Sequence, residues 1–307
     1  MRGGEVGAAW THARAVFKLC AFVLCGAVML IVDSQVHIWA AHTPERPWPA
    51  SDPNLPAAHK PQPITADDLS REMKVANVDR AVLISPVFEG ARNDVVVAAA
   101  HAHPDRFTVM GRFDPEAPGA RDIVESWRDE PAVRGVRFTF HRPHQRPWLV
   151  EGQLDWLWAH AERHNMPAML LVAHHDLPYV ARLAERHPGL RIALDHFGLT
   201  EGRDERAFAE FDQVLALARL PNIAVKVSCL PLYTNDQYPF RRLHPHIRRA
   251  YDMFGPQRMF WGSDLSRLPC SYRESVTMFT EEMPWLPARD LELIMGRALC
   301  AWLDWKA

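Results

Sequence analysis

Eight short apolar runs, rich in branched residues and separated by stretches of helical periodicity, most constrain the fold of this chain. The run 168–172, Ala-Met-Leu-Leu-Val, is apolar at every position, which is typical of a strand covered on both faces. Strands that alternate with helices form repeated βα units and a parallel sheet. The expected strands are Leu30–His37, Arg80–Pro86, Phe107–Phe113, Val133–Phe140, Ala168–Ala173, Arg191–Asp195, Ile223–Cys229 and Met259–Ser263.

The stretches between these runs have apolar residues at three- and four-residue spacing and recognisable helix ends. Thr65 and Asp68 have the spacing of a capping box, which satisfies the first backbone donors of a helix. The prolines in AHPDRF and RHPGLRI stand just past two expected helices and stop them. The expected helices are Ile64–Val78, Asp94–His103, Gly152–His164, Leu177–His187 and Glu205–Leu220.

Eight βα units are the number that closes a (β/α)₈ barrel, and this α/β fold is our prediction. An open doubly wound sheet has the same alternation but usually carries a glycine-rich phosphate loop after its first strand, and no such loop follows residues 30–37. A length of 307 residues fits one barrel, and no Gly/Ser-rich linker divides the chain. We therefore predict one domain over residues 29–307.

Residues 1–28 stand apart from this pattern. Val16–Val32 is almost entirely apolar and is preceded by basic residues, as in a signal peptide or a membrane anchor. The apolar run nevertheless passes directly into the first expected strand, without a clear cleavage site or a linker. We expect that Met29 is the true first residue and that residues 1–28 are foreign to the fold. An export or anchor segment is the alternative.

Charge and cysteine content narrow the classes of partner. The net charge is −2 and the basic residues are scattered, which argues against nucleic acid as a partner. We expect a small-molecule substrate and no membrane as a partner. The sequence predicts no oligomeric state. The cysteines have neither a CxxC motif nor zinc-type spacing, and we interpret them as buried free thiols of a cytoplasmic protein. They are Cys20, Cys25, Cys229, Cys270 and Cys300.

Polar residues gather at the carboxyl ends of the expected strands, where a closed barrel places its catalytic groups. Gln35 and His37 are two residues apart, so both side chains point to the barrel mouth while Val36 packs against helices. His196 and Asp264 each follow an apolar strand where structure needs no ionisable group. Because a carboxylate at the mouth can take a proton from water or bind a cation, we predict that Asp264 is catalytic, with loop capping as the alternative.

Two cations lie within the same strands. Arg137 is costly inside an apolar strand unless it meets an anion, and a substrate carboxylate is the expected partner. The same argument applies to Lys226, for which an ion pair with a barrel acid is an equal alternative. His174 and His175 are weaker candidates, because 16 histidines place some near strand ends by chance.

Six short motifs occur in order along the chain: VDSQVHIW (32–39), AHPDRFTVMGRFD (102–114), GVRF (135–138), LDHFG (194–198), VKVS (225–228) and FWGSDL (260–265). Together they resemble the amidohydrolase-related family, also called amidohydrolase 2, and its lactonase-like branch. The resemblance covers roughly residues 30–303. It implies a distorted (β/α)₈ barrel that hydrolyses lactones or amides, or that decarboxylates aromatic and related acids in one branch.

The resemblance also implies roles for single residues. His37 matches the second histidine of the family's first-strand His-x-His motif, His196 the sixth-strand histidine, and Asp264 the eighth-strand aspartate that activates water. These three are the implied metal ligands, and Arg137 resembles the arginine that some lactonases use for a substrate carboxylate. Gln35 departs from the pattern, because it stands where the motif has its first histidine.

That departure affects the metal. An amide oxygen is a poorer zinc ligand than an imidazole nitrogen, which excludes a two-metal centre from our prediction. Two alternatives stay open: one weakly bound divalent metal, zinc or manganese, or none. Without a metal, Lys226, Arg137 and His196 would polarise the carbonyl.

The sequence thus predicts a hydrolase that opens a lactone, or a similar cyclic ester or amide, of a small carboxylated molecule. Asp264 takes the proton from water, while His196 and His37 orient or polarise the carbonyl, directly or through a metal. Lys226 is the third predicted catalytic residue, beside Asp264 and His196. Arg137 and Gln35 contact the substrate. A metal-dependent decarboxylase on the same barrel is the first alternative, and a non-catalytic or exported binding barrel is the second.

Overall fold

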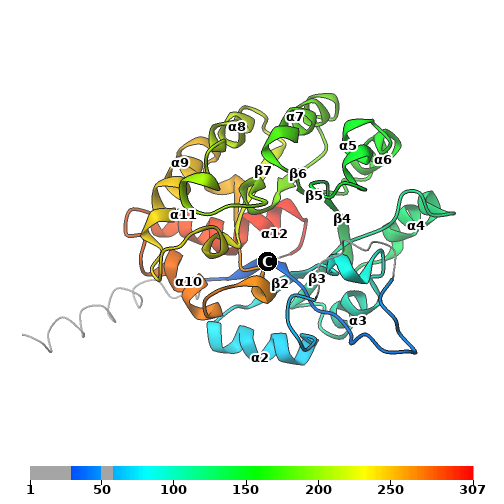
Figure 1. Ribbon diagram of the computed structural model, residues 1–307, viewed down its shortest axis with the longest axis horizontal. Coiled ribbons are helices and arrows are strands. Elements are labelled where there is room, and N and C mark those ends of the chain that lie inside the picture. Colours follow the sequence, from blue (N-terminus) through cyan, green and yellow to red (C-terminus); the bar gives the residue numbers. More distant parts are fainter. Residues whose placement is uncertain (1–28, 50–57, 307) are drawn as a thin grey trace, which may run out of the picture.

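The computed structural model describes residues 29–49 and 58–306, and in them eight parallel strands follow one another around a single sheet in chain order. This confirms the predicted (β/α)₈ barrel, which Figure 1 shows nearly end-on. The expectation for residues 1–28, with Cys20 and Cys25, lies outside the described residues. The strands are β1 (Val32–Val36), β2 (Arg80–Leu83), β3 (Phe107–Gly111), β4 (Val133–Thr139), β5 (Ala168–Leu171), β6 (Ile192–Leu194), β7 (Ile223–Ser228) and β8 (Met259–Gly262).

Helices surround the barrel and bury one apolar face each against the strands (Figure 1). Helix α2 begins at the predicted capping box, in which Thr65 Oγ1 accepts from the Asp68 backbone N–H at 3.1 Å and Asp68 Oδ2 accepts from the Thr65 N–H at 3.0 Å. The helices are α2 (Ala66–Ala76), α3 (Asp94–Ala102), α4 (Ala120–Ser126), α5 (Arg146–Val150), α6 (Asp155–Arg163), α7 (Leu177–Arg186), α8 (Phe211–Ala216), α9 (His244–Phe254), α10 (Tyr272–Thr280), α11 (Ala288–Glu292) and α12 (Ala298–Trp302).

The expected helix Glu205–Leu220 is wrong as one element. The chain instead forms a short turn at Asp204–Arg206, then α8, then a further short turn at Leu217–Arg219. Asp204 has a left-handed backbone with φ of 49°, and its carboxylate accepts from Thr234 Oγ1 at 2.7 Å and from the Asn235 backbone N–H at 3.2 Å. These contacts to the loop after β7 take the place of the first helical turn.

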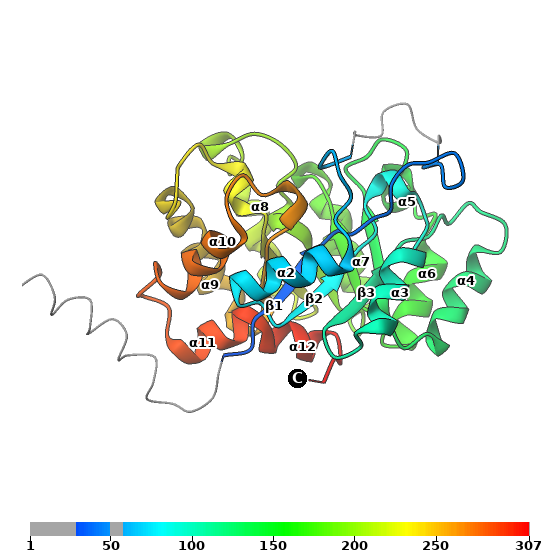
Figure 2. The same ribbon diagram turned by 90° about the horizontal axis from the view of Figure 1, so that it is seen from below.

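A second apolar layer fills the barrel interior. It consists of inward-facing strand residues such as Met110, Met169 and Phe260, and the C-terminal segment adds Leu299 and Trp305 to it. Figure 2 shows that α12 lies across one end of the barrel, opposite the loops that follow the strands. Because one end is sealed in this way, the opposite end is the place for a site.

Strands β1 and β8 meet at that open end through polar contacts. The Asp33 carboxylate accepts hydrogen bonds from the backbone N–H groups of Gln35 and Ser263, both at 2.9 Å, and also from Tyr272 Oη at 2.7 Å. The Asp264 N–H donates to the Gln35 carbonyl at 2.9 Å. Gly262 permits this approach, since a Cβ there would lie 2.4 Å from Ser34 Oγ. The two strands that end in site residues are therefore fixed to each other.

Other expectations concern the surface and the thiols. Within residues 29–49 and 58–306, no helix is long and apolar enough to cross a membrane. The described cysteines are free, as predicted, and Cys229 and Cys300 are buried, whereas Cys270 is only half-buried.

Candidate active site

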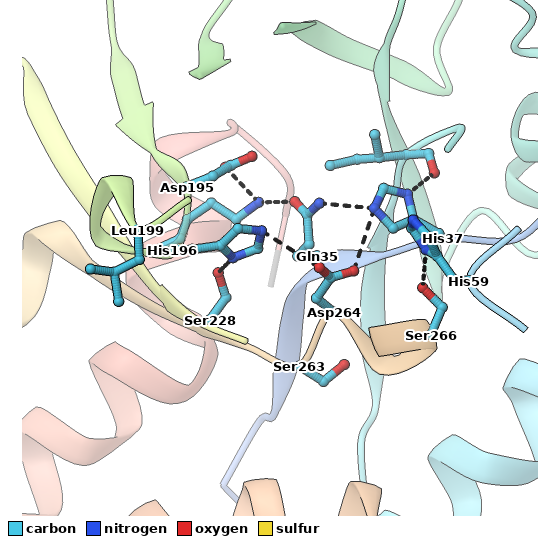
Figure 3. A network of polar contacts seen from close by, with 12 residues as sticks. Gln35, His37, His59, Asp195, His196, Leu199, Ser228, Ser263, Asp264 and Ser266 are labelled. Carbon is cyan, nitrogen blue, oxygen red and sulfur yellow. Dashed lines mark hydrogen bonds and ion pairs between the residues drawn. The ribbon is translucent and has the colours of Figure 1, made fainter. Parts of the chain in front are cut away.

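Asp264 lies at the centre of a buried polar network at the barrel mouth (Figure 3). Its Oδ1 is 3.4 Å from His37 Nε2, and its Oδ2 is 3.6 Å from His196 Nε2. Burial raises the pKa of this carboxyl to about 6, although Arg267 and Lys226 oppose the shift. Such a carboxylate is ionised at neutral pH and still basic enough to accept a proton. The structure thus brings the three predicted residues His37, His196 and Asp264 together.

The two histidines are held as neutral rings. His37 Nδ1 lies 2.7 Å from the Ile84 carbonyl, which can only accept a hydrogen bond, so Nδ1 carries the proton and Nε2 has a free lone pair. His196 Nδ1 lies 2.7 Å from Ser228 Oγ. Burial lowers the pKa of His37 well below its usual value and that of His196 to about 3. Neither ring competes with Asp264 for a proton at neutral pH.

Gln35 bridges a cation and an imidazole. Its Oε1 accepts a hydrogen bond from Lys226 Nζ, and its Nε2 lies 3.2 Å from His37 Nε2 (Figure 3). The amide orientation follows from its partners, because an ammonium only donates and this imidazole nitrogen accepts. Both ends of the amide are therefore used inside the protein, and the role of Gln35 in substrate binding stays a prediction.

Sequence reasoning missed Asp195, which lies beside the site and pairs with both predicted cations. Its Oδ1 is 2.9 Å from Lys226 Nζ and its Oδ2 is 2.7 Å from Arg137 Nε. Burial opposes ionisation of Asp195, but Arg137 and Lys226 outweigh it and lower the pKa to about 2. The open alternative for Lys226, an ion pair with a barrel acid, is the arrangement seen here. The signal was the ionisable residue that ends the sixth apolar run, next to His196.

Arg137 is only 3% exposed, and besides Asp195 it donates to the Phe138 carbonyl at 2.5 Å and to Thr139 Oγ1 at 2.6 Å. Its role as substrate anchor stays a prediction. His174 and His175 do not join the network described here. His174 Nε2 lies 3.3 Å from the Phe197 carbonyl, and His175 is exposed beside Asp176.

The rim above this network is rich in arginine. His59, from the loop after β1, contacts Ser266 Oγ at 2.8 Å, and its ring lies 5.4 Å from that of His37. Burial lowers the pKa of His59 to about 4, and Arg267 and Arg112 lower it further. The pKa of His141 is lowered to about 3 by burial, with Arg267 and Arg112 among the further causes. Both histidines therefore share a positive environment, which the sequence order of these residues does not reveal.

One cluster of side chains at the ends of β6, β7 and β8 could hold a metal ion. His196, Asp264 and the unforeseen Cys229 place one ligand atom each within 4.8 Å of one another, and all three are buried. Among the residues that the structure describes, none donates a hydrogen bond to the buried Oδ1 of Asp264. His37 Nε2 is near but is already in contact with Gln35. An imidazole, a thiol and a carboxylate form a donor set that zinc accepts.

Comparison with known proteins gives a consistent result. A family model described as amidohydrolase matches residues 32–296, which is most of the chain. An L-fucono-1,5-lactonase from Burkholderia ambifaria is 27% identical over 77% of this chain and 81% of its own. A 4-sulfomuconolactone hydrolase from Hydrogenophaga intermedia is 23% identical over 76% of this chain and 73% of its own.

Among solved structures, an amidohydrolase from Burkholderia multivorans, crystallised with bound zinc, has a TM-score of 0.75. The match has 22% sequence identity and covers 90% of this chain and 99% of that one. At this identity the similarity shows the shared barrel fold.

Proposed function

The chain belongs to the amidohydrolase family, and on that basis we propose that this enzyme opens the lactone ring of a small anionic molecule, with Asp264 as the general base. The position of Asp264 carries the proposal: a buried carboxylate with a pKa of about 6 stands between two neutral histidines at the mouth of the barrel. The names of two relatives, a fuconolactonase and a sulfomuconolactone hydrolase, support lactones as the substrate class.

The reaction needs one water molecule and no oxidant. Asp264 accepts a proton from water as the water oxygen bonds to the lactone carbonyl carbon. The ring carbon–oxygen bond then breaks, and the proton passes from Asp264 to the leaving oxygen, so that a hydroxy acid is formed. Lys226 and the rim arginines face the developing negative charge with fixed positive charge, which lowers the barrier in a water-poor site.

The charge of the mouth favours an anionic substrate. Arg267, Lys226 and Arg137 place positive charge around Asp264, and Arg267 and Arg112 do the same around His59. The single carboxylate of Asp195 pairs with two of these cations, Lys226 and Arg137, so positive charge is in excess. A substrate carboxylate or sulfonate would be attracted to the excess. Arg267 is the exposed member of this set and follows Asp264 by three residues, so we assign the substrate anion to Arg267 before Arg137.

The zinc-bound relative supports a metal in this proposal. His196 and Asp264 would hold it, and the ion would supply a Lewis acid to the carbonyl. His37 is the third ligand implied by the family resemblance, but its Nε2 is occupied by Gln35.

Asp264→Asn tests the assignment. Asparagine keeps the shape and tolerates the left-handed backbone at this position, where φ is 52°, but it cannot take up a proton. We expect kcat for an anionic lactone to fall by about 10²–10⁴-fold, with an unchanged Tm. Asp252→Asn, at an exposed carboxylate on α9, is the matched control. Full turnover by the Asp264→Asn variant would exclude the proposed base.

The same assay tests the substrate class. KM is measured for two lactones that share the same ring, one with a carboxylate substituent and one without. Arg267→Gln is expected to raise KM for the carboxylated lactone alone. Release of carbon dioxide from aromatic acids, with no lactone opened, would favour the decarboxylase alternative instead.

A further inference from the structure

Three neighbouring strands are followed by the same unusual backbone turn. His196 after β6, Cys229 after β7 and Asp264 after β8 have φ values of 51°, 59° and 52°. None of them is glycine, and a non-glycine residue in this left-handed region costs of order 1 kcal/mol. Strain of this kind gathers at functional sites, where the surrounding structure holds a side chain in a required direction.

The three turns direct their side chains to one point. The ligand atoms, one nitrogen, one sulfur and one oxygen, all lie within 4.8 Å of one another. Each of the three residues is only 1% exposed. Cys229 therefore belongs to the same cluster as the two residues that the family resemblance already implicates.

The remaining contacts of His196 and Asp264 leave their ligand atoms directed at this point. His196 uses Nδ1 for Ser228 Oγ, so Nε2 is the atom that faces Asp264. The 3.6 Å between His196 Nε2 and Asp264 Oδ2 is too long for a hydrogen bond. The other carboxylate oxygen, Oδ1, is buried and accepts no hydrogen bond from residues 29–49 or 58–306. Asp264 therefore keeps a carboxylate oxygen that can bind a cation placed near His196 Nε2.

We propose that Cys229 is a thiolate ligand of a zinc ion that it binds together with His196 and Asp264. The thiolate takes over the coordination that the first-strand motif loses at Gln35, because Gln35 Nε2 occupies His37 Nε2. This inference rests on the proposed function, since it concerns the same site. Three protein ligands of mixed type are usual for catalytic zinc, and a thiolate favours zinc over manganese or magnesium. Binding releases the thiol proton to solvent.

A structural role for Cys229 makes a different prediction. Without a metal, the thiol donates a hydrogen bond to Asp264, and burial raises the pKa of the thiol well above its usual value. In that case the sulfur would never bond to an added ion, and its loss would leave metal affinity unchanged.

The test uses the full chain, stripped of metal with a chelator and then titrated with Co²⁺ or Zn²⁺ in the absence of substrate. A thiolate bound to Co²⁺ gives an intense near-ultraviolet charge-transfer band, which nitrogen and oxygen ligands do not give. We expect this band in the wild-type protein at one equivalent of Co²⁺. We also expect Cys229→Ser to abolish the band and to weaken zinc binding by at least about tenfold.

Two further variants keep the test decisive. Cys229→Gly removes the thiol and relieves the left-handed backbone, and it must also lose the band. Cys270→Ser removes a half-buried thiol near the site and must keep the band and the affinity. Cobalt binding without the band, or unchanged zinc affinity in both Cys229 variants, overturns the inference. A band without lactone turnover overturns only the proposed function.

Discussion

At position 35 a glutamine amide lies between a buried cation and a neutral imidazole, and both of its ends are used. Sequence reasoning identified this residue by what it replaces, a metal-binding histidine. The structure adds what it does instead: it accepts from Lys226 and donates to His37. Gln35 is thus a poor metal ligand, but both ends of its amide form hydrogen bonds inside the site.

This role makes a prediction for stability. Gln35→Leu keeps the side-chain volume but leaves Lys226 without one acceptor and His37 without its donor. We expect a loss of about 1–3 kcal/mol in the free energy of unfolding, measured by urea denaturation. Gln153→Leu, at an exposed glutamine, should change it by less than about 0.5 kcal/mol. Equal midpoints for the two variants would argue against the bridge.

At the scale of an element, β1 carries the first site residues and has an irregular register against β2 between Asp33 and Val36. The Asp33 carboxylate supports this irregularity by its bonds to Gln35, Ser263 and Tyr272. Burial raises the pKa of Asp33 despite these bonds, so the carboxylate is held at a cost in solvation. The sequence predicted the strand and the direction of Gln35 and His37, but the buried acid beside them was not singled out.

Replacement of this acid should loosen the junction of β1 and β8. In Asp33→Asn, one oxygen becomes an amide donor that faces other donors, and we expect the protein to lose about 3 kcal/mol of stability in urea denaturation. Tyr272→Phe removes one bond to the same carboxylate and should cost about 1 kcal/mol. Because the junction positions Gln35 and Asp264, kcat should fall more in Asp33→Asn than in Tyr272→Phe. The reverse order would contradict the assignment.

At the scale of the whole molecule, the net charge of −2 does not reflect the local charge at the barrel mouth, where positive side chains gather. The loops after several strands bring Arg112, Arg267 and two half-buried histidines, His59 and His141, into one region. The overall charge argues against nucleic acid as a partner, but it gives no indication of this local excess of positive charge.

These two half-buried histidines make stability depend on pH. Burial first, and arginines next, lower the pKa of His59 to about 4 and that of His141 to about 3, from 6.5 in the unfolded chain. Between these values the unfolded state binds more protons, so their contribution to stability is complete above pH 6.5 and is lost as the pH falls toward 4. We therefore expect the Tm of the protein to decrease as the pH is lowered from about 7.5 to about 5.

A double variant, His59→Gln with His141→Gln, isolates this contribution. The decrease in Tm over this pH interval should be smaller for the double variant than for the wild-type protein. His175→Gln, at an exposed histidine, should show the same decrease as the wild-type protein. Parallel curves for all three proteins would show that other groups cause the acid sensitivity.

The sequence by itself determined the strands, their parallel order and the residues at their ends. Apolar periodicity is a local property, and the carboxyl ends of parallel strands meet at one edge in any closed barrel. His37, His196 and Asp264 could therefore be placed together in advance. The helix Glu205–Leu220 failed because contacts from the loop after β7 outweigh local periodicity.

Only the tertiary structure decided how these residues are paired. Asp195 forms ion pairs with Arg137 and Lys226, His59 reaches the site from a loop, and Cys229 joins His196 and Asp264. The cluster of His196, Cys229 and Asp264 depends on left-handed turns after three strands, which the packing of the whole barrel holds in place. Distances between side chains from different strands follow from that packing, because no local pattern in the sequence encodes them.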